Sequence, residues 1–341
     1  MSIFSNKIVV VTGGTGSLGK VLTRILLSGS SGTPKKIIIF SRDETKQHFM
    51  RLEYEKMEKA TDEIIYNNFE RLLEFRIGDV RDYHSVCSAL KNANIVINAA
   101  ALKQVPSCEY FPFEAVQTNI VGAQNITRVI HENKFPIETV VGVSTDKACK
   151  PVNVMGMTKA IQERVFTTAN ITVPETRFIC VRYGNVLASR GSVIPLFREQ
   201  IKNGGPVTIT TEEMTRFLLP LEQAVETIFA AVEMGNRGET FVPKVPSAHI
   251  TDVAKVLIGN RNIDITFTGI RPGEKIHEIL ISDEEAWHTY EISDYYVIRP
   301  MLPELIGKKS EDQLLKKEYS SKDSIMSLKK VTDLINNHNL L

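Results

Sequence analysis

An acid and an amine stand side by side at the end of an apolar run of this chain. Thr145, Asp146 and Lys147 follow the apolar segment Thr139–Val143, which predicts a buried strand. In open α/β sheets, ligands bind at the edge formed by the carboxyl ends of the strands. We therefore expect these three side chains at a catalytic centre, where a carboxyl group and an amine can transfer protons. The alternative interpretation is a solvated loop with one incidental ion pair.

A glycine-rich segment near the N-terminus is typical of dinucleotide binding. The apolar run 7–12 leads directly into the pattern G-x-x-G-x-x-G, and a second apolar run follows at 36–40. Glycines at this spacing let backbone N–H groups approach a pyrophosphate at the positive end of a helix. The predicted cofactor residues of this segment are Thr12, Gly13, Thr15, Gly16, Ser17, Leu18 and Gly19.

The residues after the second apolar run discriminate between the two nicotinamide cofactors. An NAD site usually presents a carboxylate to the ribose hydroxyl groups, whereas an NADP site presents a cation to the 2′-phosphate. Ser41 and Arg42 come first here, which favours NADP, while Asp43 at the next position leaves NAD open. Asp79 and Val80 follow a third apolar segment and are expected to clasp the adenine, with a polar turn and helix cap as the alternative.

Composition and charge exclude several classes of protein. A chain of 341 residues with 43% hydrophobic residues has material for a sizeable core, and its formal net charge of +1 argues against a nucleic-acid partner. The sequence has no run apolar enough for a membrane helix and no signal-peptide pattern, so we expect a cytoplasmic protein without a membrane partner. No Cys/His spacing indicates a metal site, and free thiols are expected at Cys87, Cys108, Cys149 and Cys180.

Strand-like and helix-like segments alternate along the first half of the chain. Apolar runs at 95–98, 139–143 and 176–182 are separated by helical patterns at about 112–133 and from Met155 onward. Such alternation is typical of βαβ units. It predicts an α/β fold with a Rossmann-like, doubly wound parallel sheet.

The second half of the chain is less regular, with glycine and proline residues between shorter elements. We predict an NADP-binding domain over 1–182, a smaller substrate-binding lobe over 183–310 and a tail over 311–341. The helix at about 217–235 is expected to return to the first domain and cover its sheet. The tail is expected to hold one amphipathic helix near 327–336.

Five motifs, in order over about residues 5–300, resemble those of extended short-chain dehydrogenase/reductases. More narrowly, the chain resembles bacterial UDP-N-acetylglucosamine 4,6-dehydratases. The Thr-Asp-Lys triplet is the most specific of the motifs. They are Thr-Gly-Gly-Thr-Gly-Ser-Leu-Gly (12–19), Ala-Ala-Ala-Leu-Lys-Gln-Val (99–105), Ser-Thr-Asp-Lys-Ala (144–148), Arg-Tyr-Gly-Asn-Val (182–186) and Arg-Pro-Gly-Glu-Lys (271–275).

This resemblance implies a nucleotide-sugar substrate, UDP-N-acetylglucosamine, and a tightly bound NADP that is recycled in every turnover. The implied reaction oxidises C4, eliminates water across C5 and C6, and returns the hydride to C6. It requires a base for the C5 proton and an acid for the C6 hydroxyl group. Lys147, with a pKa lowered by burial and by the nearby cofactor, is the expected base, and Asp146, with a pKa raised toward neutrality, is the expected acid.

The chain departs from the family pattern at one catalytic position. The Tyr-x-x-x-Lys motif of the superfamily runs from Met155 to Lys159 here, and a thioether cannot take the C4 hydroxyl proton. The chain is similar to a subset of dehydratases with methionine at this place. Lys159 is still expected to hold the nicotinamide ribose, and the C4 proton is left to Asp146, Lys147 or a water held by Thr145. The alternative is a fold that survives as a binding module.

The resemblance also implies contacts to both ligands elsewhere in the chain. Lys103 is expected to reach the sugar or a phosphate, with an exposed loop cation as the alternative. Asn185, Arg216 and Arg271 are expected to bind the diphosphate, because guanidinium groups suit phosphate oxygens. Asn119 is expected beside the chemistry, hydrogen-bonded to backbone. The remaining expected contacts are Ala99, Ala100, Ala101 and Tyr183 for the cofactor, Glu274 for the uridine ribose, and Ser192, Val193, Thr208 and Thr210 for the uracil.

Three functions compete for this sequence: a dehydratase, an NADP-dependent epimerase or reductase of nucleotide sugars, and a non-catalytic NADP-binding module. The Asp146–Lys147 pair favours the dehydratase, because a simple 4-epimerase needs neither a C5 base nor a C6 acid. A simple 4-epimerase also relies on the tyrosine that is replaced by Met155 in this chain. Segment 151–156 reads closer to the retaining members, so we expect retention at C5, with inversion as the alternative.

The family resemblance implies a homodimer or a larger homo-oligomer. Extended members usually associate through two helices across a two-fold axis, here those at about 112–133 and 155–170. The same apolar residues would serve equally for packing of the helices on the sheet. They are Ile126, Val129 and Ile130 in the first helix, and Ile161, Val165 and Phe166 in the second.

Overall fold

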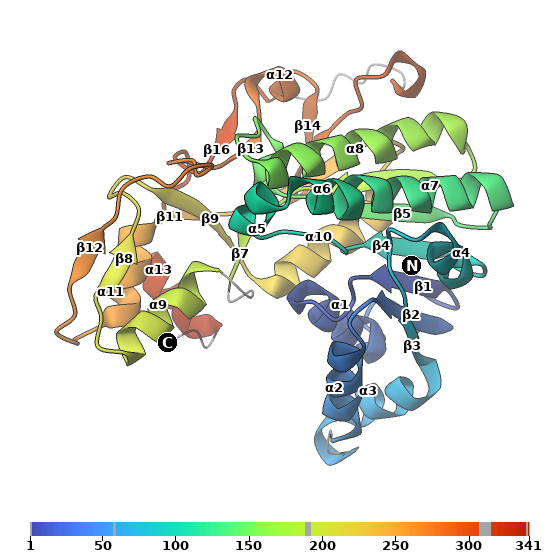
Figure 1. The fold of residues 1–341 in the computed structure, drawn as a ribbon, viewed down its shortest axis with the longest axis horizontal. Coiled ribbons are helices and arrows are strands. Elements are labelled where there is room, and N and C mark those ends of the chain that lie inside the picture. The colour runs from blue at the N-terminus through green and yellow to red at the C-terminus, as the bar shows by residue number, and fades with distance from the viewer. Residues whose placement is uncertain (1, 57–58, 188–191, 307–314, 339, 341) are drawn as a thin grey trace.

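The computed structural model describes residues 2–56, 59–187, 192–306, 315–338 and 340, arranged in two lobes (Figure 1). The larger lobe is built on a sheet in the order β14-β15-β10-β6-β5-β4-β1-β2-β3. Its 3-2-1-4-5-6 part is the order of a doubly wound dinucleotide fold, as predicted. The strands are β1 (Ile8–Thr12), β2 (Lys36–Ser41), β3 (Leu73–Ile77), β4 (Ile95–Asn98), β5 (Thr139–Val143), β6 (Arg177–Val181), β10 (Thr240–Pro243), β14 (Thr289–Ile292) and β15 (Tyr295–Ile298).

Helices cover both faces of this sheet, which makes the lobe a three-layer α/β structure. Strand residues alternate between the two faces: Val9 and Val11 belong to one core and Val10 to the other. All three side chains are fully buried, which explains why the predicted strands read as unbroken apolar runs. The first core is covered by α1 (Ser17–Ser28), α3 (Lys59–Leu72) and α10 (Leu221–Met234), and the second by α4 (Tyr83–Leu90), α7 (Gly122–Asn133) and α8 (Val154–Thr172) (Figure 1).

The helical run predicted over 112–133 is present and contains a π-helical segment. α6 (Pro112–Ala115) leads into η1 (Val116–Val121) and then into α7. Short π-helical segments are frequent at functional sites. In α7, Ile126, Val129 and Ile130 are buried against the sheet, so this face packs inside the molecule and is not a free surface for a dimer.

The sheet is larger and less uniform than the predicted parallel sheet. β10 pairs with β6 in parallel, but β15 pairs antiparallel with both β10 and β14. Residues 240–243 and 289–298 therefore extend the sheet of the first lobe, although the predicted boundary assigned them to the second. Phe241 and Val297 are fully buried in the same core as α10. Only long-range strand pairing places them there.

The smaller lobe has its own core, to which the C-terminal tail contributes. The predicted tail helix is confirmed as α13 (Leu328–Asn337), and its Val331 and Ile335 are fully buried beside α11 (Ile250–Ile258). The tail also supplies a strand that pairs with β13.

The other described elements of the whole chain are β7 (Asn185–Val186), β8 (Val207–Ile209), β9 (Thr215–Leu219), β11 (Ser247–His249), β12 (Ile265–Phe267), β13 (Ile279–Ile281), β16 (Tyr319–Ser320), α2 (Glu44–Glu55), α5 (Val105–Tyr110), η2 (Asp146–Ala148), α9 (Val193–Lys202), α12 (Asp283–Ala286) and η3 (Pro303–Leu305).

The cysteines and the helices add three facts about the described residues. All four cysteine thiols are free. None of the described helices is both long and apolar enough to cross a membrane. No cluster of three or more His, Cys, Asp or Glu side chains with the arrangement of a metal site occurs in the described part of the chain.

Candidate active site

A cavity of about 960 Å³ lies at the carboxyl ends of the parallel strands, and both lobes line it. Motifs that are far apart in the sequence meet here, from the glycine-rich turn to the loop after Arg271. Every site residue predicted from the sequence lines this cavity except Thr12, Asn119 and Asp146. Those three side chains are almost completely buried beside it.

The glycine-rich turn between β1 and α1 is packed too closely for side chains. Gly13 has a φ of +65°, and a Cβ there would lie 2.8 Å from the backbone of Ala100. A Cβ at Gly19 would lie 2.3 Å from the carbonyl oxygen of Gly14. Gly16 is the N-cap of α1, and no side chain caps this helix. The first N–H groups of α1 therefore remain available at the cavity wall, which fits the pyrophosphate of a dinucleotide.

The end of β2 presents cations to the cavity. Arg42 and Lys46 both line it. Asp43 is the N-cap of α2: it accepts a hydrogen bond from the backbone N of Lys46 at 2.9 Å and also pairs with the ammonium of that residue. The Asp43 carboxylate, which could have bound the ribose hydroxyl groups of NAD, is thus engaged in capping α2. The Arg42 guanidinium lies 3.8 Å from the Asp79 carboxylate, a long ion pair.

Asp79 and Val80 form a turn beside Arg42, and both line the cavity. Asp79 accepts hydrogen bonds from the backbone N and the Nε of Arg81, at 3.0 and 2.9 Å. The Val80 carbonyl oxygen accepts from Asn125 Nδ2 at 2.9 Å. Asp79 and Val80 therefore do form the polar turn given as the alternative. Both residues also line the cavity, where the adenine was expected. On the neighbouring strand, the Ser41 hydroxyl accepts from Gln47 Nε2 at 3.0 Å.

Helix α8 presents Lys159 to the cavity. Its Nζ donates to the Val143 carbonyl oxygen at 2.5 Å and to Gln162 Oε1 at 2.7 Å. Burial lowers the pKa of this ammonium to about 8. Lys159 is therefore held rigidly at the end of β5, one turn of helix beyond Met155.

Met155 lines the cavity at the position where the superfamily pattern has tyrosine. Its side chain is 7% exposed and packs in a small apolar cluster with Cys108 and Ala115. The thioether therefore contributes a nonpolar wall, and any acid–base chemistry in this part of the cavity must come from its neighbours.

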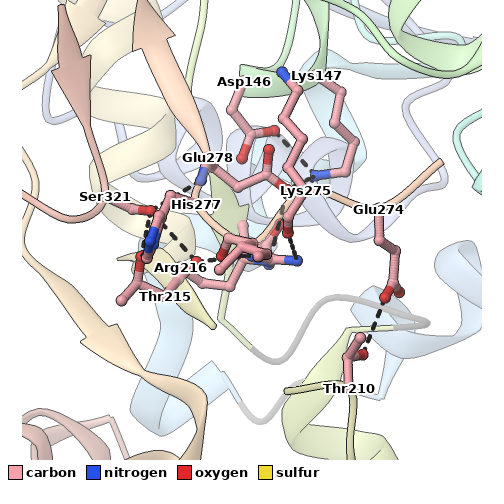
Figure 2. Close-up of polar contacts among 12 residues, drawn as sticks. Asp146, Lys147, Thr210, Thr215, Arg216, Glu274, Lys275, His277, Glu278 and Ser321 are labelled. Atoms are coloured by element: carbon pink, nitrogen blue, oxygen red, sulfur yellow. Dashed lines mark hydrogen bonds and ion pairs between the residues drawn. The ribbon is translucent and has the colours of Figure 1, made fainter. Parts of the chain in front are cut away.

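Three charged side chains meet at the start of η2 (Figure 2). Lys147 Nζ donates to Asp146 Oδ1 at 3.1 Å and to Glu278 Oε1 at 3.2 Å, and it lies 3.4 Å from Asn185 Oδ1. Thr145 Oγ1 donates to Asp146 Oδ1 at 2.8 Å. Lys147, Glu278 and Thr145 line the cavity, whereas Asp146 lies directly behind them.

The pKa values of this cluster are shifted in three different ways. Burial raises the pKa of Asp146; the Lys147 ammonium opposes this shift and Glu278 reinforces it. Burial also opposes the charge on Glu278, but Lys147, Arg216 and Lys275 together hold the pKa of Glu278 below its usual range. Of the two carboxyl groups, Glu278 is thus the one on which the negative charge is favoured.

The expected lowering of the Lys147 pKa is wrong. Burial does act in that direction, but the two neighbouring carboxyl groups outweigh it, and the pKa of Lys147 is raised. Sequence reasoning took account of burial and not of Glu278, which lies 131 residues away along the chain. Lys147 therefore faces the cavity as an ammonium group.

Glu278 is the functional residue that sequence reasoning missed. It follows the Arg271-Pro-Gly-Glu-Lys275 motif by three residues, and a carboxylate so close to a motif was the available signal. Nothing local indicates that its side chain crosses to η2. In the structure its backbone N is held at 2.9 Å by the Ser321 hydroxyl, which fixes the strand that carries it.

The cationic and polar residues of the smaller lobe are arranged differently from the prediction. Arg216 lines the cavity, but it donates to the carbonyl oxygens of Thr215, Ile276 and Lys275 at 2.8, 3.0 and 2.9 Å, and lies 3.6 Å from Glu278. Most N–H groups of the Arg216 guanidinium therefore bond backbone carbonyl oxygens, two of them in the loop that precedes Glu278. Figure 2 shows this arrangement.

Arg271 and Glu274 lie on the loop that closes the other side of the cavity. Glu274 Oε2 accepts from Thr210 Oγ1 at 3.0 Å, just beyond the end of β8 (Figure 2). Thr208, Ser192 and Val193 line the same region, as predicted. The Ser192 hydroxyl is buried without a partner among the described residues. The exposed Lys103 lies at the rim, on the loop after β4.

Two of the residues outside the cavity wall hold its backbone. Asn119 Oδ1 accepts from the Leu102 N at 2.8 Å, and its Nδ2 donates to the Leu102 O and to Thr158 Oγ1 at 3.0 and 2.9 Å. Thr12 Oγ1 accepts from the Ala100 N at 3.2 Å. Asn119 thus bonds the backbone as expected, and its fully buried side chain leaves it no direct contact with a substrate in the cavity.

A buried ion cluster lies behind the catalytic strand ends. Arg182 bonds Glu163 of α8 at 2.6 Å and Glu285 of α12 at 2.7 Å, and all three side chains are largely buried. Ser144 Oγ donates to Glu163 Oε1 at 2.5 Å. The cluster joins the strand ends, the helix with Lys159 and the segment after β13.

Comparison with known proteins identifies the family of this chain. Residues 9–300 match the family described as "Polysaccharide biosynthesis protein". A protein of Rickettsia rickettsii named UDP-glucose 4-epimerase is 46% identical over 301 residues, which cover 87% of this chain and 84% of that protein. A protein of Campylobacter jejuni named UDP-N-acetylglucosamine 4,6-dehydratase (inverting) is 43% identical over 303 residues, covering 88% and 85%.

A solved structure is similar over almost the whole chain. The X-ray structure of Pen from Bacillus thuringiensis superposes with a TM-score of 0.88 at 36% identity and covers 99% of each chain. The chain therefore belongs to the polysaccharide biosynthesis protein family, and its resemblance to UDP-N-acetylglucosamine 4,6-dehydratases among the extended short-chain dehydrogenase/reductases is confirmed.

Proposed function

We propose that this protein is a UDP-N-acetylglucosamine 4,6-dehydratase, a hydro-lyase that forms UDP-2-acetamido-2,6-dideoxy-4-hexulose. The observation that carries the proposal is the Asp146–Lys147 pair at a dinucleotide-type cavity. Lys147 lines the cavity, and Asp146 is buried next to it. Dehydration needs proton transfers at C5 and C6 that simple epimerisation does not. Met155 supports the same choice, because it removes the phenol on which a 4-epimerase of this superfamily relies.

A nicotinamide dinucleotide bound along the glycine-rich turn would supply the acceptor and donor of the C4 hydride. The chain then has to manage the protons. Asp146, neutral in the resting site, is the source of the proton for the departing C6 hydroxyl group, and it connects to the cavity through Thr145 and Lys147, which both bond its Oδ1. The Lys147 ammonium also stabilises the negative charge that develops when C5 loses its proton.

Lys147 can take the C5 proton only after it has given up one of its own. Glu278 Oε1 lies at 3.2 Å from Lys147 Nζ, within reach of that transfer. The C4 hydroxyl proton, which Met155 cannot accept, is released to solvent by way of the Thr145 hydroxyl, because Asp146 still holds its own proton at that stage. Asp146 is reprotonated from solvent after water has left, so the protons balance over one turnover.

We propose NADP as the cofactor in preference to NAD. Arg42 and Lys46 offer cations at the end of β2, and capping of α2 engages the Asp43 carboxylate. This arrangement suits a 2′-phosphate. Lys159, at the end of β5, is placed to bind the nicotinamide ribose.

The substrate diphosphate and uridine are assigned to the smaller lobe. Arg271 and Lys103 are the cations we propose for the phosphates, with Asn185 beside them, while Arg216 acts mainly by holding the loop. Glu274, positioned by Thr210, is proposed to accept from the ribose hydroxyl groups.

Two observations bear on the stereochemical course at C5. The sequence near 151–156 favours retention, whereas two Campylobacter jejuni relatives, at 43% and 42% identity, carry the name inverting. The two relatives match 88% and 91% of this chain, whereas the indication of retention comes from six residues. We therefore favour inversion. A second candidate function is UDP-sugar 4-epimerisation, because several relatives of similar identity carry that name.

One experiment tests both the reaction and its stereochemistry. The purified protein is incubated with UDP-N-acetylglucosamine in deuterated water, and proton NMR follows the sugar ring. Dehydration gives a 4-keto-6-deoxy sugar with deuterium at C5, and its ring couplings assign retention or inversion. A 4-epimer without loss of water would instead establish the epimerase, and a parallel incubation with UDP-glucose tests that reaction on its named substrate.

We also propose a homo-oligomer, formed through the outer faces of the two expected helical segments. Val165 and Phe166 of α8 pack inward, but Met157 and Ile161 are each 48% exposed on its outer face. Tyr110, Phe111 and Phe113 are exposed at the end of α5 and the start of α6. Sedimentation of the wild-type protein as a strict monomer at micromolar concentration would contradict this.

A further inference from the structure

Lys147 is shared by two carboxyl groups that come from distant segments of the chain, one in η2 and one just before β13. Its Nζ lies 3.1 Å from Asp146 Oδ1 and 3.2 Å from Glu278 Oε1, and both groups point toward it in Figure 2. Each carboxyl group keeps a second oxygen, Asp146 Oδ2 and Glu278 Oε2, that is buried and has no hydrogen-bond partner among the described residues. Asp146 is 0% exposed and Glu278 is 2% exposed.

The surroundings of the two carboxyl groups differ in charge. Asp146 has one cation, Lys147, and the attraction of that cation is offset by the nearby Glu278. Its free oxygen faces the backbone of Gly184, where a Cβ would lie 3.3 Å away. Glu278 has the same ammonium, together with Arg216 at 3.6 Å and Lys275 on its own loop. A single negative charge is therefore more stable on Glu278 than on Asp146.

We propose that Glu278 is a positioning residue for the dehydration: it holds the negative charge of the cluster and thereby keeps Asp146 neutral, as the stored proton donor. Its catalytic consequence rests on the proposed function, whereas its effect on Asp146 does not. The arrangement is a pair of acids that differ in environment and divide one proton between them.

The proton movements follow from this division. Lys147 passes one proton to Glu278 across 3.2 Å and becomes an amine, which can take the C5 proton. Asp146 releases its proton toward the C6 hydroxyl group, and water leaves. The C4 hydroxyl proton leaves to solvent before these steps, because Asp146 is still protonated at that stage. When C5 is protonated again by Lys147, the proton on Glu278 returns to the amine, and Asp146 takes one proton back from solvent. No other acid or base is consumed.

The groups that face this pair are few and can be named. They are Lys147 and Thr145 from η2, Arg216 from β9, Lys275 from the loop before Glu278, Asn185 from β7 and Ser321 after β16. The neighbouring His277 is turned away and bonds Thr215 Oγ1 at 2.8 Å. The ionisation of Asp146 and Glu278 is thus set mainly by three cations and by each other.

Infrared spectroscopy can test the proposal without substrate. Protein labelled with ¹³C at the aspartate carboxyl carbon should show, at pH 7, the carbonyl stretch of one protonated aspartate that is absent from Asp146→Asn. In Glu278→Gln this band should be lost at pH 7, because Asp146 then ionises against Lys147 alone. Glu278→Asp, which keeps the charge, should retain the band at least in part.

Activity supplies the second measurement. In Glu278→Gln we expect kcat at pH 7 to fall by about tenfold or more, and the alkaline fall of the kcat profile to move to lower pH. Asp283→Asn removes an exposed carboxylate that pairs with Lys150 and should change neither property. A protonated-aspartate band that persists in folded Glu278→Gln, or is absent from the wild type, overturns the proposal. Failure to dehydrate the nucleotide sugar overturns only the proposed function, because the infrared result does not depend on it.

Discussion

Asn153 holds the carbonyl oxygen of Gly273 across the boundary between the two lobes. Its Nδ2 donates to that oxygen at 2.8 Å, while its Oδ1 caps α8 by accepting from the Gly156 N at 2.8 Å. Gly273, with a φ of +78°, lies between Arg271 and Glu274 on the loop that lines the cavity. One side chain thus connects the helix that carries Lys159 with the loop that we assign to the substrate.

Two substitutions at Asn153 should separate these roles. Asn153→Ala loses the cap and the bond between lobes, so we expect about 1 kcal/mol lower stability and a KM for the nucleotide sugar raised about fivefold. Asn153→Ser can still cap the helix but cannot reach Gly273 at the same time. It should regain the stability, measured by urea unfolding, and keep the raised KM. An unchanged KM in both variants would show that the bond does not position the loop.

Met155→Tyr should lower kcat, even though it restores the residue of the superfamily pattern. The side chain is 7% exposed and packs with Cys108 and Ala115, so a larger phenol must turn into the cavity. We expect kcat at saturating substrate to fall by about tenfold, with Met155→Leu as the apolar control close to wild type. A strong rise in kcat for Met155→Tyr would mean that this position is vestigial.

Arg42→Ala should change the preference between cofactors. Removal of the cation at the end of β2 should weaken NADP binding by about tenfold or more, since hydrogen bonds to charged groups contribute about 1.5–3 kcal/mol. NAD binding should hardly change. Calorimetric titration of both cofactors against wild type and variant gives the ratio directly, and an equal loss for NAD and NADP would contradict an NADP site.

The pH dependence of cofactor binding should report on Lys159. Because burial lowers its pKa to about 8, the ammonium is present below that pH and is lost above it. We expect affinity for the nicotinamide dinucleotide to fall as pH rises through about 8. Lys159→Arg stays charged and should remove this dependence, although its absolute affinity will differ. NMR of ¹³C-labelled lysine side chains provides an independent measurement of the same titration.

Arg182 should be the most sensitive ionic residue for stability. Arg182→Met leaves Glu163 and Glu285 buried without their cation, which should cost about 3–5 kcal/mol of unfolding free energy at neutral pH. Although burial opposes it, Arg182 holds the pKa of Glu285 below its usual range. The stabilisation is therefore present above the unfolded pKa, about 4.3, and is lost as pH falls through the folded pKa.

The difference between wild type and Arg182→Met should accordingly narrow in acid. Arg128→Met is the matched control, because Arg128 forms an exposed pair with Glu132 on one helix. It should change the unfolding free energy by no more than about 0.5 kcal/mol. A gap for Arg182→Met that stays constant as pH falls from 7 to well below about 4.3 would show that lost packing, and not charge, explains the loss.

Local patterns predicted the parts of the fold that are decided locally. The apolar runs around Val9 and Val141 became β1 and β5, and the glycine turn became the start of α1, because burial on both faces and tight turns leave direct marks on the sequence. β10, β14 and β15 were missed as members of the main sheet, since only distant pairing decides which sheet a short strand joins.

The same distinction holds for the site. Asp146 and Lys147 were found because they are adjacent and follow a strand. Glu278 was not found, because its role depends on a contact between residues 131 positions apart. The direction of the Lys147 pKa was wrong for that reason alone: burial can be guessed from an apolar context, whereas the charge of an unseen neighbour cannot.

One edge of the main sheet is formed by β10, β15 and β14, which are translated long after β6, and this order affects folding during biosynthesis. β6 is covered on its outer side by β10, and β10 in turn by β15, so the sheet is complete only after residue 298 has left the ribosome. Until then the nascent chain presents an unpaired apolar strand edge, which is a template for wrong pairing. A fragment that stops at residue 182 should therefore aggregate, and the two lobes should melt together as one cooperative unit.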